Sequence, residues 1–187
     1  MRSTRGQSLS TSNRYGGAGL VGIIGATAAA AVIALTGASE GVSLTPYNDK
    51  LAGTLATVCY GETNVPMRRY TLAECKGMLS DSLAGYAAGV RETVPGFDSL
   101  TDGQKVAAID YAYNRGLGSW ARASRPGEPP SIMAAYRRRD FPAACELYPK
   151  WALLRRGEKW IDCSVRANGC YGIYTRRMKE RAACLGE

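Results

Sequence analysis

A run of 25 residues without a charged side chain, from Tyr15 to Ser39, constrains what this 187-residue chain can fold into more than any other feature. A helix of about 20 apolar residues spans a bilayer, so the run is long enough to cross a membrane. Three arginines and no acidic residue precede it, which predicts a cytoplasmic N-terminus and export of everything that follows. Residues 1–14 are polar and basic, and we expect them to be disordered.

The apolar segment is weak for a permanent membrane anchor. It contains only seven large aliphatic residues, and most of the remainder is glycine and alanine. Three interpretations are open: a cleaved signal peptide, a permanent anchor, and an anchor that can leave the membrane. Thr36-Gly37-Ala38 is a poor version of the small-x-small site at which a signal peptide is cleaved. We therefore favour the anchor that can leave the membrane.

The composition excludes several kinds of chemistry. The chain has no histidine, which excludes Ser-His-Asp and Cys-His catalysis and every zinc site that needs an imidazole. Its net charge of +8 favours binding to polyanions, among which charge alone does not discriminate. The arginine runs at 137–139 and 155–156 lack the interleaved aromatics or the recognised module of a nucleic-acid-binding protein. We expect no nucleic-acid partner, no metal and no cofactor.

Six cysteines follow the apolar segment. An even number on one side of a membrane segment indicates an oxidising compartment and a disulfide framework, although six reduced thiols in a cytosolic protein are the alternative. Six cysteines allow 15 pairings. Only Cys163 with Cys170 is predicted as a pair, because this pair closes a short loop.

Beyond Ser39 the pattern is mainly helical, with one short β-like region. Residues 54–60 are rich in β-formers and lie between two glycines. Thr71-Leu-Ala-Glu74 and Thr101-Asp-Gly-Gln104 are typical of capping boxes that open helices. Further helices are expected at 129–139, 141–153 and 175–185. The pattern predicts an α+β fold dominated by helices, with a small β-hairpin region and a preceding apolar helix.

The acidic residues that follow the apolar segment are candidates for catalysis. Glu40 comes directly after the segment, Asp49 lies nine residues further on, and Thr57 lies shortly before a glycine turn. Hydrolysis of a glycosidic bond uses two carboxyls, one to protonate the leaving oxygen and one to activate water or stabilise positive charge. A carboxyl that borders an apolar helix also tends to keep its proton to higher pH, as an acid catalyst must. Two acids at this spacing are common in proteins, so the spacing alone does not decide the matter.

Four ordered motifs give this pair its context: Glu40-Gly-x-x-Leu-x-x-Tyr-x-Asp49, Thr57-Val-Cys-Tyr-Gly61, Tyr113-Asn114-Arg-Gly116-Leu-Gly118 and Gly172-Ile173-x-x-Arg176-Arg177-x-x-Glu180. Together they resemble the phage-type lysozymes, the muramidases of glycoside hydrolase family 24, over residues 40–187. The glycine- and alanine-rich lead is similar to that of the signal-anchor-release endolysins of lambdoid phages.

The resemblance implies roles for individual residues. It makes Glu40 the general acid, Asp49 the residue that positions or activates water, and Thr57 the hydroxyl partner of Asp49. In members of this family an arginine of the terminal helix pairs with the acid glutamate. Arg176 and Arg177 are the two candidates here.

Asn114 matches a motif that lies near the cleft in the family. For this asparagine, as for Arg176 and Arg177, a helix cap or a solvated helix face is the alternative interpretation.

Two departures from the family pattern affect these assignments. Seven residues separate Asp49 from Thr57 where the family motif has five, so Thr54 is the alternative hydroxyl. We prefer Thr57 because it directly precedes Val58-Cys-Tyr-Gly61. Many members of the family have histidine where this chain has Glu62, which adds a third carboxyl that is either a spectator or a substitute acid.

The sequence thus predicts three segments: a basic N-terminus (1–14), a signal-anchor (15–39) and a lysozyme-like catalytic domain (40–187). The resemblance implies hydrolysis of the β-1,4 bond between N-acetylmuramic acid and N-acetylglucosamine in peptidoglycan, with lysis of the host cell. A lytic transglycosylase and a non-catalytic wall-binding or membrane-lysis protein are the alternatives. We expect the chain to be held in the inner membrane with its catalytic domain in the periplasm, and then to be released there as a monomer.

Overall fold

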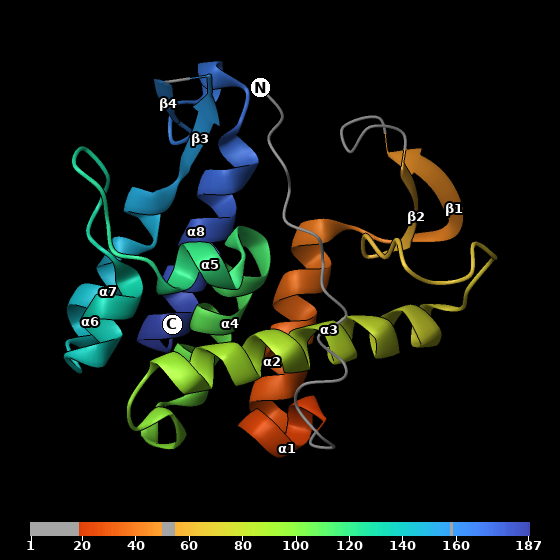
Figure 1. Cartoon of the computed structure of the whole chain (residues 1–187), viewed down its shortest axis with the longest axis horizontal. Coiled ribbons are helices and arrows are strands. Elements are labelled where there is room, and N and C mark those ends of the chain that lie inside the picture. The colour runs from red at the N-terminus through yellow and green to blue at the C-terminus, as the bar shows by residue number, and fades with distance from the viewer. Residues whose placement is uncertain (1–18, 50–54, 158) are drawn as a thin grey trace.

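The computed structural model describes residues 19–49, 55–157 and 159–187, and the predicted disordered N-terminus lies outside these ranges. Most of the described chain is helical (Figure 1). The helices are α1 (Leu20–Ile24), α2 (Ala26–Glu40), α3 (Leu72–Thr93), α4 (Asp102–Arg115), α5 (Leu117–Ala121), α6 (Ile132–Arg137), α7 (Phe141–Leu147) and α8 (Tyr171–Leu185). The strands are β1 (Ser43–Asp49), β2 (Leu55–Cys59), β3 (Leu153–Arg156) and β4 (Lys159–Asp162), paired as two antiparallel hairpins. An α+β fold dominated by helices is therefore confirmed.

The described part of the apolar segment forms two helices that pack into the core. α1 and α2 are separated by Gly25, and both contact α3, while α2 also packs on α4. The residues that face inward along α2 are Ala28, Ala29, Val32 and Thr36, all of them buried. Within the ranges described above, no helix is both long and apolar enough to span a bilayer.

The two predicted capping boxes are present and begin the two helices that flank α2. Thr71 accepts a hydrogen bond from the Glu74 backbone while the Glu74 carboxylate accepts one from the Thr71 backbone, and Thr101 and Gln104 repeat the arrangement. Such reciprocal caps satisfy backbone donors that a helix start leaves without partners. α3 crosses α2 and connects the β1–β2 hairpin to the remaining helices (Figure 1).

α4 and α8 cross in close contact. A Cβ atom added to Gly103 of α4 would lie 2.0 Å from the carbonyl oxygen of Ala183 in α8, so only glycine fits at this point. This contact fixes how far α8 slides along α4. It thereby sets where the first turns of α8 stand relative to the end of α2.

The segment between α7 and α8 differs from the sequence prediction. A helix over 141–153 was expected, but α7 ends at Leu147, a short 3-10 turn follows over Pro149–Trp151, and β3 begins at Leu153. The β3–β4 hairpin, which the sequence did not predict, stands over the N-terminal end of α8 (Figure 1). A disulfide between Cys163 and Cys170 joins the end of this hairpin to the start of α8.

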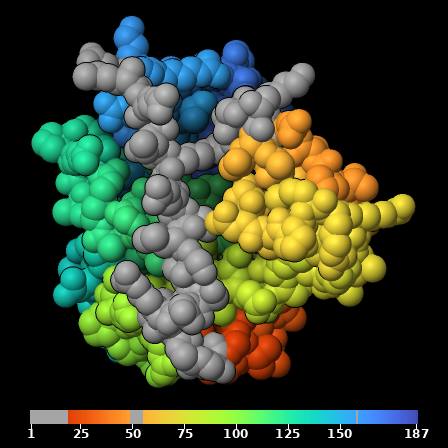
Figure 2. Space-filling view, turned by 45° about the vertical axis from the view of Figure 1, so that its right-hand side comes forward, coloured from red at the N-terminus to blue at the C-terminus, as the bar shows by residue number. Residues whose placement is uncertain are grey.

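Two further disulfides connect distant parts of the chain. Cys59 of β2 is joined to Cys75 of α3, and Cys145 of α7 is joined to Cys184 of α8. All six cysteines are therefore paired, as expected for a protein of an oxidising compartment. In the space-filling view the orange and yellow surface, from β1–β2 to the first turns of α3, lies on the side opposite the green surface of α5 and its neighbours (Figure 2).

Candidate active site

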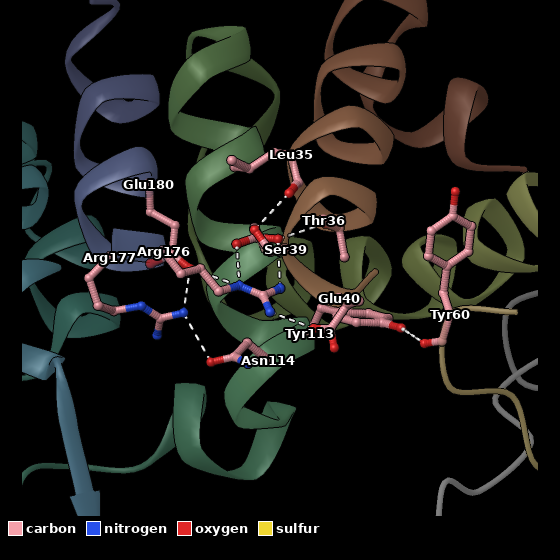
Figure 3. Close-up of polar contacts among 11 residues, drawn as sticks. Leu35, Thr36, Ser39, Glu40, Tyr60, Tyr113, Asn114, Arg176, Arg177 and Glu180 are labelled. Carbon is pink, nitrogen blue, oxygen red and sulfur yellow. Dashed lines mark hydrogen bonds and ion pairs between the residues drawn. The ribbon is translucent and has the colours of Figure 1, made fainter. Parts of the chain in front are cut away.

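Glu40 is the last residue of α2, and its position is fixed by the way that helix ends. Gly41 follows with φ +74°, a conformation that residues other than glycine rarely adopt, and the helix stops there. The Glu40 side chain remains 30% exposed and points toward α8, where the Arg176 guanidinium Nη1 donates a 2.5 Å hydrogen bond to its Oε1 (Figure 3). The carboxyl is thus held in place while still open to a substrate.

Arg176 is held from the opposite side by a carboxylate of α4. Its Nε and Nη2 donate to the two oxygens of Asp110 at 2.9 and 2.8 Å, a two-point contact that fixes the guanidinium plane (Figure 3). The Thr36 hydroxyl of α2 donates a 2.7 Å hydrogen bond to the same Asp110 carboxylate. Burial alone would raise the pKa of Asp110, but the Arg176 guanidinium outweighs it and lowers that pKa, so Asp110 is ionised.

Arg177, the other candidate for pairing with Glu40, lies elsewhere. It donates to the Asn114 side chain at 3.0 Å and to the Glu180 carboxyl at 2.5 Å, and it stands over the Tyr111 ring. Glu180 is fully buried, and burial raises its pKa well above the ordinary value. The Arg177 cluster therefore ties α8 to α4 beside the site instead of contacting the candidate acid.

The β1–β2 hairpin holds the remaining candidates. Asp49 is the last residue of β1, and its backbone pairs with Leu55 of β2; the Asp49 side chain and the alternative residue Thr54 lie outside the described part of the structure. Thr57 of β2 is buried, and its hydroxyl donates a 2.9 Å hydrogen bond to the Leu55 carbonyl oxygen. Because Asp49 lies opposite Leu55, Thr57 is two residues along β2 from the partner of Asp49.

Glu62 lies between the β1–β2 hairpin and α3. Its backbone bridges to Val58, and its carboxyl accepts a 3.1 Å hydrogen bond from Ser82 of α3. Burial raises the pKa of Glu62, because the half-buried carboxyl has lost water around its charged form. Burial raises the pKa of Tyr113, and the charges of Glu40 and Glu62 raise it further, so the two carboxyls face a common region. The Tyr113 hydroxyl donates weakly to the Tyr60 carbonyl oxygen at 3.5 Å.

A cavity of about 400 Å³ adjoins the candidate acid. The end of α2, Asn114 of α4 and the first turns of α8 line it, with Glu40 and Arg176 in its wall and Lys179 at its edge. A cavity of this volume is within the usual range for small-molecule sites. The site therefore offers a partly exposed carboxyl, fixed by a cation, beside a space that a substrate can enter.

Comparison with known proteins agrees with this geometry. The model of the family described as phage lysozyme matches residues 37–180. This chain belongs to the phage lysozyme family. It is thus a glycosidase that hydrolyses peptidoglycan.

Among curated proteins, this lysozyme is 29% identical over 174 residues to the SAR-endolysin of Bacteriophage PS34, covering 89% of this chain and 91% of that protein. It is 28% identical over the same length to the SAR-endolysin of Bacteriophage PS119, with the same coverage. Among solved structures, the active form of the P1 phage endolysin Lyz aligns with a TM-score of 0.65 at 20% identity, covering 83% of each chain. The endolysin of Escherichia coli O157:H7 phage FAHEc1 aligns with a TM-score of 0.66 at 16% identity, covering 83% of this chain and 90% of that one.

Two residues of the site of this lysozyme, Asp110 and Thr36, were not predicted from its sequence. Asp110 follows a run of apolar residues on α4 and is fully buried, and an acid in such a stretch requires a buried cation. Thr36 sits on the inward face of α2, four residues before Glu40. An acid on an apolar helix face was the signal that could have identified this pair.

Proposed function

We propose that Glu40 protonates the glycosidic oxygen between N-acetylmuramic acid and N-acetylglucosamine as the bond to that oxygen breaks. One observation carries this proposal: Glu40 is the carboxyl that is both fixed by a buried arginine and exposed to the cavity. A carboxyl in that setting can meet a substrate in a single orientation, as proton donation in a transition state requires. Arg176 then stabilises the Glu40 carboxylate that remains after the proton has left.

The β1–β2 hairpin supplies the second half of the reaction in this proposal. Asp49 activates or positions the water that attacks the sugar, and Thr57 supports it from β2. The backbone register supports this assignment, since Asp49 ends β1 within two ladder positions of Thr57. The Thr57 hydroxyl hydrogen is engaged by Leu55, which leaves the hydroxyl oxygen free to accept a hydrogen bond.

Analysis of the released sugars tests the reaction. A hydrolase adds one water per bond cleaved and leaves a reducing N-acetylmuramic acid end, whereas a lytic transglycosylase forms a 1,6-anhydro ring and adds none. Mass spectrometry of fragments from purified peptidoglycan should give only the hydrated products. Anhydro products would establish the transglycosylase, and no fragments from a folded, soluble enzyme would establish a non-catalytic wall-binding or membrane-lysis protein.

We further propose that α1 and α2 occupy the inner membrane before the enzyme becomes active, and that the released enzyme is a periplasmic monomer. The Thr36 hydroxyl and the inward-facing alanines of α2 pack on the rest of the protein, so these residues cannot be surrounded by lipid at the same time. While α2 is in the membrane, Glu40 is separated from Arg176 and the site is incomplete. The resemblance to proteins named SAR-endolysins supports such a release.

The burial of each residue in α2 decides which substitutions can test release from the membrane. Leucine at Ala28 or Ala29 would also overpack the core, because both residues are buried. The small residues on the exposed side of α2 are better targets, namely Ala26, Ala30, Ala31 and Ala34. Leucine at these four positions should strengthen membrane insertion by adding apolar surface while leaving the inward face unchanged.

Cell fractionation and the timing of lysis give the result. Wild type should appear in membrane and soluble fractions, and the four-leucine variant only in the membrane, with delayed lysis. Serine at the same four positions is the matched control and should shift the protein toward the soluble fraction. If the leucine variant lyses cells on the wild-type schedule, membrane release does not control activity. Sedimentation of the soluble fraction tests whether it is a monomer.

A further inference from the structure

The guanidinium that holds Glu40 is shared between two carboxyls. Asp110 receives two hydrogen bonds from Arg176 and is fully buried, whereas Glu40 receives one and is partly exposed. The contact of Arg176 with Asp110 is stronger than its contact with Glu40, because it has two hydrogen bonds and is shielded from water. Glu40 therefore meets a cation whose charge is already largely compensated.

This sharing matters because Glu40 has two opposing requirements. A lone guanidinium beside a carboxyl stabilises the ionised form and removes the proton that a general acid must donate. Without any cation, on the other hand, the carboxylate left after proton transfer would have no partner at the mouth of the cavity. A compensated arginine satisfies both requirements, since it orients the protonated acid and still pairs with the product carboxylate.

We propose that Asp110 is a positioning residue for catalysis, which offsets the charge of Arg176 from behind so that Glu40 keeps its proton until the substrate takes it. Asp110 touches neither the cavity nor the reacting atoms and acts through Arg176. This inference rests on the proposed role of Glu40 as the acid. In the step itself the proton passes from Glu40 to the glycosidic oxygen as the bond from that oxygen to the anomeric carbon of the sugar breaks. The oxygen of water bonds to the same carbon and gives its proton to Asp49, and exchange with solvent then restores the proton of Glu40 and the carboxylate of Asp49.

Thr36 connects the Arg176–Asp110 ion pair to helix α2. It lies four residues before Glu40, so the two side chains stand one turn apart on the same helix face. Its hydroxyl donates to the Asp110 oxygen that also accepts from Arg176 Nη2. This hydrogen bond holds α2 against the Arg176–Asp110 ion pair, which orients Glu40. Its donor, Thr36, belongs to the apolar segment.

The other groups near Glu40 bear on any pH measurement. Burial raises the pKa of Tyr86 on α3 and raises that of Tyr113 on α4 further, so both are neutral at working pH. On α8, Arg177 faces Asn114 and Glu180, and burial raises the pKa of Glu180 well above its ordinary value. Glu62 is the remaining described acid that faces this region, and its pKa is also raised. The experiment is therefore made in a Glu62→Gln background.

The test compares Asp110→Asn with its parent across pH. Asparagine keeps the shape of aspartate and removes its negative charge, so the positive charge of Arg176 acts on Glu40 without an offsetting carboxylate. We expect kcat at neutral pH to fall at least about tenfold, KM to stay within about twofold, and the alkaline limb of the kcat profile to move about one pH unit lower. Much of the lost activity should return on acidification. If Asp110 had only a structural role, kcat would fall by the same factor at every pH, and the alkaline limb would stay at the same pH.

Thr36 supplies a second pair of variants if Asp110→Asn does not fold. Thr36→Val keeps the shape without the hydroxyl and should lower kcat several-fold with little change in KM, while Thr36→Ser keeps the hydroxyl and should stay near wild type. Circular dichroism and thermal melts establish that each variant is folded. The inference is overturned if folded Asp110→Asn keeps the parental limb, or if Thr36→Val is as active as Thr36→Ser. Loss of activity in Glu40→Gln alongside either result would leave the proposed function standing.

Discussion

Arg176 donates a hydrogen bond to Glu40 from a helix that lies 136 residues further along the chain. Three elements have to be in place for this contact: the end of α2, the crossing of α8 on α4, and the Asp110 carboxylate that fixes the guanidinium. The hydrogen bond between Arg176 and Glu40 therefore forms only when the whole site is assembled. The predictions that follow test this assembly and the chemistry that depends on it.

Arg176→Lys should reduce both stability and activity. A lysine ammonium cannot make the two-point contact with Asp110, which leaves a fully buried carboxylate short of one donor. We expect a loss of roughly 1–3 kcal/mol in the free energy of unfolding, measured by denaturant titration, and a lower kcat. Arg181→Lys is the matched control on the same helix. It alters an exposed pair with Glu146 and should change stability much less. Equal stability for the two variants would contradict the account.

Glu62→Gln should make stability less sensitive to pH while leaving activity largely intact. The pKa of Glu62 is raised in the folded protein, so its stabilising contribution is complete below the unfolded value of 4.5 and is lost as pH rises through the folded value. The glutamine variant lacks this loss. It should gain stability relative to wild type as pH rises above 4.5, measured as the difference in melting temperature. A large loss of activity would instead identify Glu62 as the substitute acid.

Gly103→Ala should be destabilising because α4 and α8 touch at this residue. The added methyl group would lie 2.0 Å from the Ala183 carbonyl oxygen, so the helices must separate. A cost of about 1–3 kcal/mol is typical of such overpacking. Gly77→Ala in α3 is the control, since nothing lies within 4 Å of the added atom there. That variant should gain about 0.5–1 kcal/mol. If both substitutions stabilise, the close crossing is wrong.

The disulfides should contribute according to the loops they close. Cys145 and Cys184 are 39 residues apart, whereas Cys163 and Cys170 are 7 apart. Loop-closure entropy predicts about 4 kcal/mol for the first pair and about 2–3 kcal/mol for the second. Double alanine variants of exported protein, compared by denaturant titration, should follow that order. Thiol titration of unfolded wild type should find no free cysteine, and six free thiols would refute the disulfide framework.

Local features of the site were predictable from the sequence, while their combination was not. The Glu40-Gly41 helix end, the two capping boxes and the short loop between Cys163 and Cys170 depend on neighbouring residues, and the structure has all of them. Adjacent residues on a helix point about 100° apart, so the choice between Arg176 and Arg177 depends on how α8 is rotated against α4. The packing of α8 on α4 decides that rotation, and no local pattern encodes it.

The β3–β4 hairpin shows the same limit. Residues 141–153 have a continuous helical pattern, but α7 ends before Pro149 and the chain turns into a strand at Leu153. The Cys163–Cys170 disulfide and the hydrogen bond from Arg115 to the Leu153 carbonyl oxygen hold the two strands at the open end of this hairpin. Both are long-range or covalent constraints, which outweigh local propensity in so short an element.

Turnover of purified peptidoglycan by Glu40→Gln is the most direct measurement of the central claim. Glutamine keeps the shape and the contact with Arg176 but has no proton to donate, so the initial rate should fall at least about 100-fold, while the melting temperature stays near that of wild type. Asp98→Asn is the control: it removes an exposed carboxylate that pairs with Arg91, and the rate should not change. A folded Glu40→Gln enzyme that retains a rate within a few-fold of wild type would contradict the assignment of Glu40 as the acid.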